Sequence, residues 1–406
     1  MKYLVVLGDG MADYPVPQLN GKTPLQVSQK PAMDRLASLG ELGTVKTVPT
    51  GLPPGSDVAN LSVMGYDPHI YYTGRSPLEA VSMGIDLKPT DVAFRCNLVT
   101  LSDAPFYHDK TMIDYSSDEI STAESKVLMA DIAKSLNTAT FSFYPGISYR
   151  HLMVWHGGPV NCQLTPPHDI SDRPITSHLP KGDGEAQLLG LMEQSINILK
   201  NHPINQARIQ KGLRPATSIW LWGQGKKPAL KSFTEKYQLQ GSVISAVDLA
   251  KGLGLCAGLK VINVPGATGN VHTNFRGKAE AALNAFKAGQ DFIYLHFEAP
   301  DEAGHRGEIE NKILSIERIN SEALEFLLKE MPRVTEDFKI MLLPDHPTPL
   351  TLKTHVSDPV PFVIYRYSNQ ETSRRCRNFD EETAKQSGLY IEDGFTLMDR
   401  FINGQY

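Results

Sequence analysis

The N-terminal stretch MKYLVVLGDG, residues 1–10, is the part of the sequence that most strongly indicates the fold. Residues Tyr3–Leu7 are apolar at every position, which is typical of a strand buried on both faces of a parallel sheet. The tripeptide Gly8-Asp9-Gly10 then supplies turn chemistry that ends the strand. The stretch therefore predicts a central strand that carries a carboxylate, Asp9, at its carboxyl end.

Three further apolar runs end in the same way, at a turn that contains proline or acidic residues. They are Val261–Val264, Phe292–Phe297 and Lys339–Leu343. Stretches with helical spacing, such as Ala32–Leu39 and Gly277–Lys287, alternate with these runs. We therefore predict an α/β fold with a mainly parallel sheet flanked by helices, in which ligands bind at the carboxyl ends of the strands.

The middle of the chain has a different composition. From about residue 85 to 180 it is rich in Pro, Gly, His and aromatic residues. It contains candidate strands, including Val92–Leu101 and His151–Trp155, and one helical run, Glu124–Leu136. We interpret residues 85–180 as a smaller α+β domain inserted into a catalytic domain formed by residues 1–84 and 181–406.

Length, charge and cysteine content limit the class of protein. The 406 residues carry 40 basic and 45 acidic side chains, and this net charge of −5 indicates neither a nucleic acid nor a membrane surface as a partner. No apolar run reaches the roughly 18 residues of a membrane span, and the N-terminal run is too short for a signal peptide. The four cysteines, Cys96, Cys162, Cys256 and Cys376, form no C-x-x-C pair. We expect a cytoplasmic protein without a disulfide framework; an oligomer is neither indicated nor excluded.

Side chains that can ligate a metal follow the predicted strands. Asp301 and His305 are four residues apart, which places them on one side of a helix. Asp345 and His346 follow the last apolar run, and His355 lies nine residues further on. Each of these residues alone is more simply explained as a turn, capping or surface residue. As a set with Asp9, they predict neighbouring sites for divalent ions such as Zn or Mn.

Ser56 stands in the segment GLPPGSDVANLS, residues 51–62, where a Pro/Gly loop leads into a helical run. Its simplest role is that of a helix N-cap. Alternatively, it is a nucleophile at a helix N-terminus, where unpaired N–H groups and the helix dipole favour a phosphate. Two metal ions beside such a serine form the usual arrangement for phosphoryl displacement.

The order of these residues resembles the alkaline phosphatase superfamily. More narrowly, the whole chain resembles the archaeal-type cofactor-independent phosphoglycerate mutases, and a similar bacterial branch has been proposed to act as a homoserine kinase. The segments that carry this resemblance are MKYLVVLGDGMADYP, TVPTGLPPGSDVANLSVMGYDP, YTGRSPLEAVSMGI and APDEAGHRG. The resemblance implies an alkaline-phosphatase-like fold and a metal-dependent isomerase of glycolysis.

The resemblance also implies a mechanism and a set of site residues. Ser56 would be the nucleophile in the interconversion of 3-phosphoglycerate and 2-phosphoglycerate, through a phosphoserine, with neither bisphosphoglycerate nor a nucleotide. One metal would be held by Asp9, Ser56, Asp345 and His346, and the other by Asp301, His305 and His355. The metals could be Mn, Zn, Mg or Co. The small phosphorylated hydroxy-acid substrate would be bound by Arg75, Arg95, Asn97, Arg150 and Lys251.

Three alternatives remain beside the mutase. The first is a homoserine kinase-like phosphotransferase, although the sequence contains no G-x-x-x-x-G-K-[ST] phosphate loop. The second is another metal-dependent phosphomutase or phosphatase on the same core. The third, a non-catalytic metal-binding module, is disfavoured because Ser56 and all six other expected ligands are present.

Overall fold

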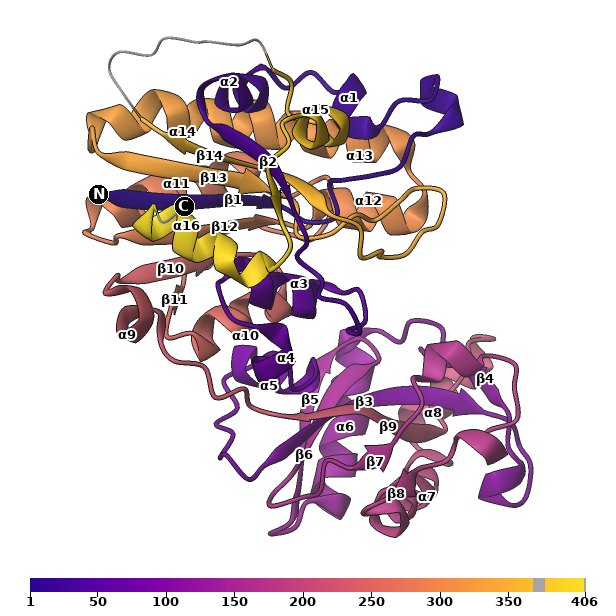
Figure 1. Cartoon of the computed structure of the whole chain (residues 1–406). Helices are drawn as coiled ribbons and strands as arrows, with labels where there is room; N and C mark the ends of the chain where they lie inside the picture. Colours follow the sequence, from indigo (N-terminus) through magenta and orange to yellow (C-terminus); the bar gives the residue numbers. More distant parts are fainter. Residues whose placement is uncertain (368–376, 405–406) are drawn as a thin grey trace. The chain divides into compact units, whose positions relative to one another are not determined.

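Strand β1 (Lys2–Gly8) lies inside an eight-stranded sheet in the computed structural model, which describes residues 1–367 and 377–404 (Figure 1). The strand order is β11 (Lys260–Val261), β10 (Gly241–Ile244), β12 (Phe292–Phe297), β1, β13 (Phe338–Leu343), β14 (Val360–Arg366), β2 (Glu41–Val45) and β15 (Tyr390–Ile391). Within the described residues, β14 alone runs antiparallel to its neighbours. The predicted mainly parallel sheet is confirmed.

The predicted strands agree closely with the observed ones at the centre of the sheet and less well at its edge. Strand β12 has the predicted bounds, and β13 begins one residue before the predicted run. The prediction of a strand over Val261–Val264 is wrong in extent, because β11 comprises only Lys260–Val261. Only two residues of β11 pair with β10, and the chain then leaves the sheet toward the turn at Pro265-Gly266.

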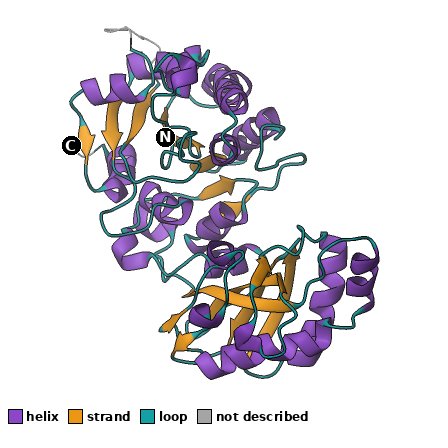
Figure 2. Cartoon of the chain, turned by 90° about the vertical axis from the view of Figure 1, so that its right-hand side faces the viewer, coloured by secondary structure: helices purple, strands orange, loops and turns teal. Residues whose placement is uncertain are grey.

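Helices cover both faces of this sheet (Figure 2). The longer ones are α2 (Pro31–Leu39), α3 (Ser56–Val63), α10 (Asp248–Cys256), α11 (Phe275–Lys287), α12 (Ala299–Arg306), α13 (Ile309–Arg318) and α16 (Leu397–Asn403); a π-helical segment, Ile319–Leu324, joins α13 to α14 (Glu325–Glu330). Leu4 and Val6 of β1 belong to the core cluster that includes α2, α11 and α14. On the other face, the Tyr3 ring lies edge-on to Phe401 of α16, with centroids 5.6 Å apart. Burial on both faces explains the uninterrupted apolar run.

Shorter helices surround the same sheet. They are α1 (Pro24–Val27), α4 (Pro68–Tyr71), α9 (Phe233–Tyr237) and α15 (Glu381–Gln386). Helix α15 packs against β2 and β14. No helix of the described residues is long and apolar enough to span a membrane. Cys96 and Cys162 have free thiols, and Cys376 lies outside the described residues.

A second compact unit is built on an antiparallel sheet of its own. Strand β3 (Val92–Leu101) pairs with β6 (Arg150–Trp155), β9 (Ser218–Lys226) and β4 (Met112–Asp114), and β5 (Phe141–Ile147) pairs with β6. The other elements are α5 (Ser76–Ser82), α6 (Thr122–Leu136), α7 (Glu185–Leu199), α8 (Pro203–Gln210) and a small ribbon of β7 (Cys162–Gln163) and β8 (Lys181–Gly182). This unit has the predicted α+β character.

The second unit is larger than the insertion expected from the sequence. It spans Thr73–Pro228, whereas the first unit comprises Met1–Tyr72 and Ala229–Tyr406. The composition change near residues 85 and 180 therefore does not mark its ends. Helix α5 and strand β9 lie outside the expected 85–180, yet both pack on β3 and belong to the same unit.

Candidate active site

Three adjacent parallel strands deliver three acidic residues to one edge of the large sheet. Asp9 follows β1, Asp345 follows β13, and Asp301 lies in the first turn of α12, directly after β12. Because β12, β1 and β13 are neighbours and run in the same direction, their carboxyl ends lie together. All three carboxylates are buried, with exposed fractions of 4% or less.

Asp9, Asp345 and His346 form the first cluster. The Nε2 atom of His346 lies 3.5 Å from Oδ1 of Asp9 and 3.3 Å from Oδ2 of Asp345. The Asp345 carboxylate is held in place by the backbone N–H of Gly10, at 3.1 Å, and by the Asn60 amide, at 2.8 Å. These potential ligand atoms all lie within 4.8 Å of one another, which is a suitable spacing for one metal ion.

Ser56 lies beside this first cluster. It is the first residue of α3, and Gly55 occupies the N-cap position. The Ser56 side chain therefore does not cap its helix; its Oγ lies 3.0 Å from Nε2 of His346. The hydroxyl stands at the N-terminus of α3, where unpaired backbone N–H groups and the helix dipole favour an anion.

Asp301, His305 and His355 form the second cluster. Nε2 of His305 lies 3.3 Å from Oδ2 of Asp301, as expected for residues four apart on a helix. Nε2 of His355 lies 3.4 Å from Oδ1 of Asp301 and 2.8 Å from Nε2 of His305. His346 also fits this cluster, since Asp301, His346 and His355 can offer ligand atoms within 4.8 Å of one another. His346 therefore lies between the two clusters.

A surrounding layer of hydrogen bonds orients these imidazoles. Nδ1 of His305 lies 3.0 Å from the carbonyl oxygen of Lys353, so in the neutral imidazole the proton belongs on Nδ1 and Nε2 is free to bind a metal. The Thr348 hydroxyl donates to Asp301 and lies 3.3 Å from Nδ1 of His346. A single side chain, Thr348, thus supports one residue from each cluster.

Gly10 is required by the close approach of the β1 turn to Asp301. Its φ of +61° falls in the left-handed region. A Cβ at this position would lie 2.7 Å from Oδ1 of Asp301 and 2.5 Å from the Thr348 hydroxyl. A side chain at residue 10 would therefore push these two supporting groups out of place.

The electrostatics of the two clusters differ. Burial raises the pKa of Asp9 well above its usual range, and the charge of Asp345 raises it further. Burial also raises the pKa of Asp301, but hydrogen bonds from His305 and His355 outweigh this effect and hold it well below its usual range. In return, the hydrogen bond to Asp301 raises the pKa of His305 to about 9. Asp301 thus has a positively charged imidazole beside it, whereas burial lowers the pKa of His296, the imidazole nearest Asp9, to about 3 and leaves it neutral.

This donor set fits divalent metal ions. Asp9 Oδ1 is buried without a hydrogen-bond partner, beside two further carboxylates and imidazole Nε2 atoms. Carboxylate oxygens and imidazole nitrogens suit Zn, Mn and similar ions. A cation between these groups would supply the positive charge that the buried Asp9 lacks.

Four of the five predicted substrate-binding residues lie in the second unit. Arg95 and Asn97 are two residues apart on β3, and Arg150 on β6 lies opposite Asn97, so all three side chains emerge from one face of that sheet. Glu79 of α5 accepts hydrogen bonds from Nε of Arg75 and Nε of Arg95, both at 3.0 Å.

Aromatic residues also contact the side chains of Arg95, Arg150 and Asn97. The Arg95 guanidinium lies 4.8 Å from the centre of the Trp222 ring, and Arg150 lies 5.2 Å from that of Tyr149. The Trp222 indole N–H donates to Asn97 at 3.0 Å. The fifth residue, Lys251, lies on α10 in the first unit. Within the second unit, the structure thus brings Arg75, Arg95, Asn97 and Arg150 together.

Sequence reasoning missed two side chains near Asp9. Nε2 of His296 lies 3.0 Å from Oδ2 of Asp9, and Glu298 completes a third group of possible ligands with these two. His296 lies within the apolar run Phe292–Phe297, and it was counted there as a strand residue and not considered as a possible ligand. A histidine one residue before the end of a buried strand is the signal that could have identified it.

The large, mainly parallel sheet gathers carboxylates and imidazoles at its strand ends beside one serine, which is a donor set typical of an α/β enzyme that uses divalent metal ions. The family model described as 2,3-bisphosphoglycerate-independent phosphoglycerate mutase matches residues 37–205. The chain is 52% identical to a Geobacter sulfurreducens protein named as a probable member, over 99% of this chain and 100% of that one. It is 49% identical to the named mutase of Methanosarcina barkeri over the full length of both chains.

Solved structures agree with this assignment. The cofactor-independent phosphoglycerate mutase of Thermoplasma acidophilum is 27% identical, with a TM-score of 0.66 over 99% of both chains. The PH0037 protein of Pyrococcus horikoshii is 29% identical, with a TM-score of 0.80 over 100% of this chain and 98% of that one. The chain belongs to the family of 2,3-bisphosphoglycerate-independent phosphoglycerate mutases, which are isomerases.

Proposed function

We propose that this chain interconverts 3-phosphoglycerate and 2-phosphoglycerate through a phosphoserine at Ser56. The observation that carries the proposal is the position of the Ser56 hydroxyl, 3.0 Å from His346 and beside two clusters of metal-ligating side chains. The names of the relatives support the substrate, and the absence of bisphosphoglycerate from the reaction follows the family.

Asp9, Ser56, Asp345 and His346 would hold one divalent ion, and Asp301, His305 and His355 the other. Ions bound there would supply positive charge that stabilises a Ser56 alkoxide and the oxygens of the transferred phosphoryl group. The surrounding groups Asn60 and Thr348 keep these ligands oriented through hydrogen bonds to Asp345, Asp301 and His346.

The proposed reaction conserves the phosphoryl group within one substrate molecule. Oγ of Ser56 forms a bond to phosphorus while the bond to the C3 oxygen breaks, and that oxygen takes up the proton that Ser56 gives up. The C2 hydroxyl of the same glycerate then forms a bond to phosphorus while the bond between phosphorus and Oγ of Ser56 breaks; Oγ takes up the proton that the C2 hydroxyl gives up, and 2-phosphoglycerate results. Catalysis of this kind depends mainly on positioning and electrostatic stabilisation.

The arginines of the second unit would bind the anionic groups of the substrate. Guanidinium groups suit phosphate and carboxylate because they donate paired hydrogen bonds in one plane. Arg75 and Arg95 share the Glu79 carboxylate, which fixes their position before substrate binds. Lys251 of the first unit is proposed as a further cationic contact.

A coupled assay of metal-stripped protein tests this proposal. We expect turnover of 3-phosphoglycerate only after Mn, Zn, Mg or Co is added back, with no bisphosphoglycerate present. Rapid quenching with acid and mass spectrometry should locate a phosphate on Ser56. The Ser56→Ala variant should lose turnover while the other six ligands still bind metal, as measured by elemental analysis. Turnover by Ser56→Ala, or none by the parent protein with any of the four ions, would contradict the proposal.

A further inference from the structure

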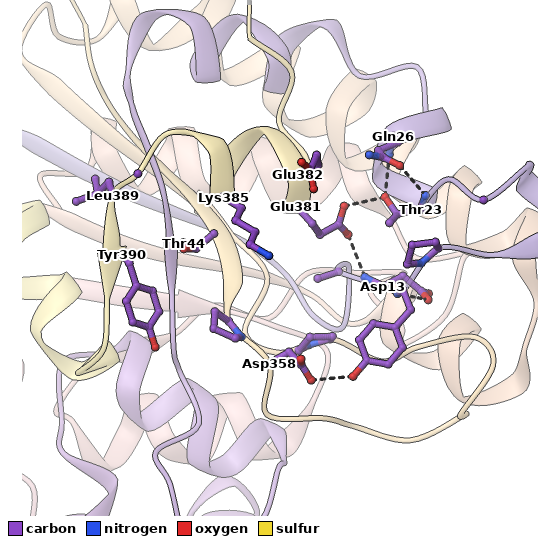
Figure 3. A pocket seen from close by; sticks show the side chains of 17 residues that line it. Asp13, Thr23, Gln26, Thr44, Asp358, Glu381, Glu382, Lys385, Leu389 and Tyr390 are labelled. Carbon is purple, nitrogen blue, oxygen red and sulfur yellow. Dashed lines mark hydrogen bonds between the residues drawn. The ribbon is translucent and has the colours of Figure 1, made fainter.

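A cavity of about 710 Å³ opens in the first unit beside the loop that follows β1 (Figure 3). Its walls come from the loop after β1, the strands β2 and β15, and helix α15. Its polar side chains include Asp13, Thr23, Asp358, Glu381, Glu382 and Lys385. Its volume is that of a site for a small organic molecule.

Glu381 and Lys385 line this cavity from neighbouring turns of α15. A glutamate four residues before a lysine is the spacing and order that favour an ion pair on a helix. These two residues form no such pair. Instead, Oε1 of Glu381 accepts the backbone N–H of Asp13 at 3.0 Å, and Oε2 accepts the Thr23 hydroxyl at 2.7 Å.

The two charges therefore face the cavity separately. Among the described residues, neither the Glu381 carboxylate nor the Lys385 ammonium has an ion-pair partner. The Lys385 side chain extends into the cavity (Figure 3). A second carboxylate, Asp358, stands at the wall next to Tyr14, whose hydroxyl donates to it at 2.8 Å. The cavity thus has an acidic side and a single basic group.

We propose that this cavity binds a small zwitterion of the amino-acid type, with its ammonium group on Glu381 and Asp358 and its acidic group on Lys385. A molecule with both charges complements each wall, whereas a simple amine or a simple carboxylate leaves one wall charge unpaired. Charged hydrogen bonds of this kind are stronger than neutral ones. The site is separate from the proposed mutase reaction and does not rest on it.

The protonation of Glu381 makes the ammonium contact dependent on pH. Burial raises the pKa of Glu381 to about 7, although its hydrogen bonds with Thr23 and Asp13 act in the opposite direction. The charged or titratable groups around it are Asp13, Tyr14, Lys312, Asp358, Asp380, Glu382 and Lys385. The zwitterion should bind more tightly as the pH rises from 6 to 8, because Glu381 then becomes ionised.

Isothermal titration calorimetry with ω-amino acids tests the proposal on the full-length protein. The series runs from glycine through 4-aminobutyrate to 6-aminohexanoate, so it varies the separation of the two charges. The controls for the best member are the alkylamine and the alkanoate of the same chain length, each of which lacks one of the two charges. We expect at least one member to bind, and each single-charge analogue to bind at least about tenfold more weakly.

Variants assign the binding to this cavity. Lys385→Gln and Glu381→Gln should each weaken the best probe about tenfold or more, whereas the exposed Lys287→Gln, on α11, should have no effect. Lys385→Gln is the variant less prone to a folding defect, because Lys385 is exposed and its side chain makes no hydrogen bond or ion pair with any residue that the structure describes. Binding should survive in Ser56→Ala, which separates this site from the active site. The proposal would be overturned if no member bound at a concentration of about 10 mM. It would also be overturned if Lys385→Gln bound the best probe as tightly as the parent protein.

Discussion

Nζ of Lys312 lies 2.7 Å from Oδ2 of Asp13, and both side chains are completely buried. The same ammonium group donates to the carbonyl oxygen of Thr348 at 2.8 Å and contacts that of Ala12 at 3.3 Å. This ion pair ties the loop after β1 to the loop that carries His346 and His355, the proposed metal ligands, because Thr348 follows His346 by two residues. Its burial with all three ammonium contacts satisfied suggests a role in holding the active-site loops.

We expect Lys312→Met to destabilise the protein by about 3–5 kcal/mol, because it leaves the buried Asp13 carboxylate without its counter-ion. Urea denaturation followed by circular dichroism measures this loss. The double variant Asp13→Asn/Lys312→Met should recover part of it, since no unpaired charge remains. A loss below about 1 kcal/mol in the single variant would show that the pair is not important for stability.

We expect Thr348→Val to weaken metal binding by about 10- to 100-fold, because the hydroxyl that supports Asp301 and His346 is removed. Thr348→Ser keeps the hydroxyl and serves as the matched control. Metal titration followed by calorimetry gives the affinity directly and does not depend on turnover. Equal affinities in the valine and serine variants would mean that the hydroxyl does not orient the ligands.

We expect Glu79→Gln to raise the KM for 3-phosphoglycerate by about tenfold or more while kcat changes little, because Arg75 and Arg95 lose the carboxylate that positions them. Steady-state kinetics in the coupled assay separates the two constants. Glu193→Gln, at an exposed position on α7, is the control for a general effect of lost charge. An unchanged KM in Glu79→Gln would count against a role for these arginines in substrate binding.

The raised pKa of Glu381, about 7 against an ordinary value of 4.5, makes stability depend on pH. Between these two values the folded state binds more protons than the unfolded state, so the contribution of Glu381 to stability falls as the pH rises. Thermal or urea unfolding between pH 4.5 and 7 should therefore show a falling component that Glu381→Gln removes. The exposed neighbour Glu382 provides the control: Glu382→Gln should leave the slope unchanged.

Local sequence patterns identified the central strands β1, β12 and β13, but not β2, β10, β14 or β15. The apolar run Phe292–Phe297 has the same bounds as β12, because a strand buried on both faces is apolar along its whole length and its ends are therefore easy to identify. The same rule concealed His296, a polar residue that is buried against Asp9. At Ser56, the sequence left two roles open, and the structure shows that Gly55 takes the N-cap position.

The ends of the second unit were not readable from composition. Helix α5 and strand β9 are ordinary in their residue types, and only their packing on β3 assigns them to this unit. Pairing between β3 and β9 joins residues that are more than a hundred positions apart, as in Cys96 opposite Leu221. Contacts of this range leave no periodic signal in a single sequence.

The sequence by itself determined the central strands β1, β12 and β13, the turns that end them, and the residue types placed there, because these depend on neighbours within a few positions. It also determined the family, through segments that contain Asp9, Ser56 and Asp301. Only the tertiary structure decided which strand ends lie side by side, and hence that His346 lies between the two ligand clusters. It likewise decided that Lys312 pairs with Asp13, and that Glu381 turns away from Lys385. Such partners are set by strand order and burial, which bring together residues hundreds of positions apart.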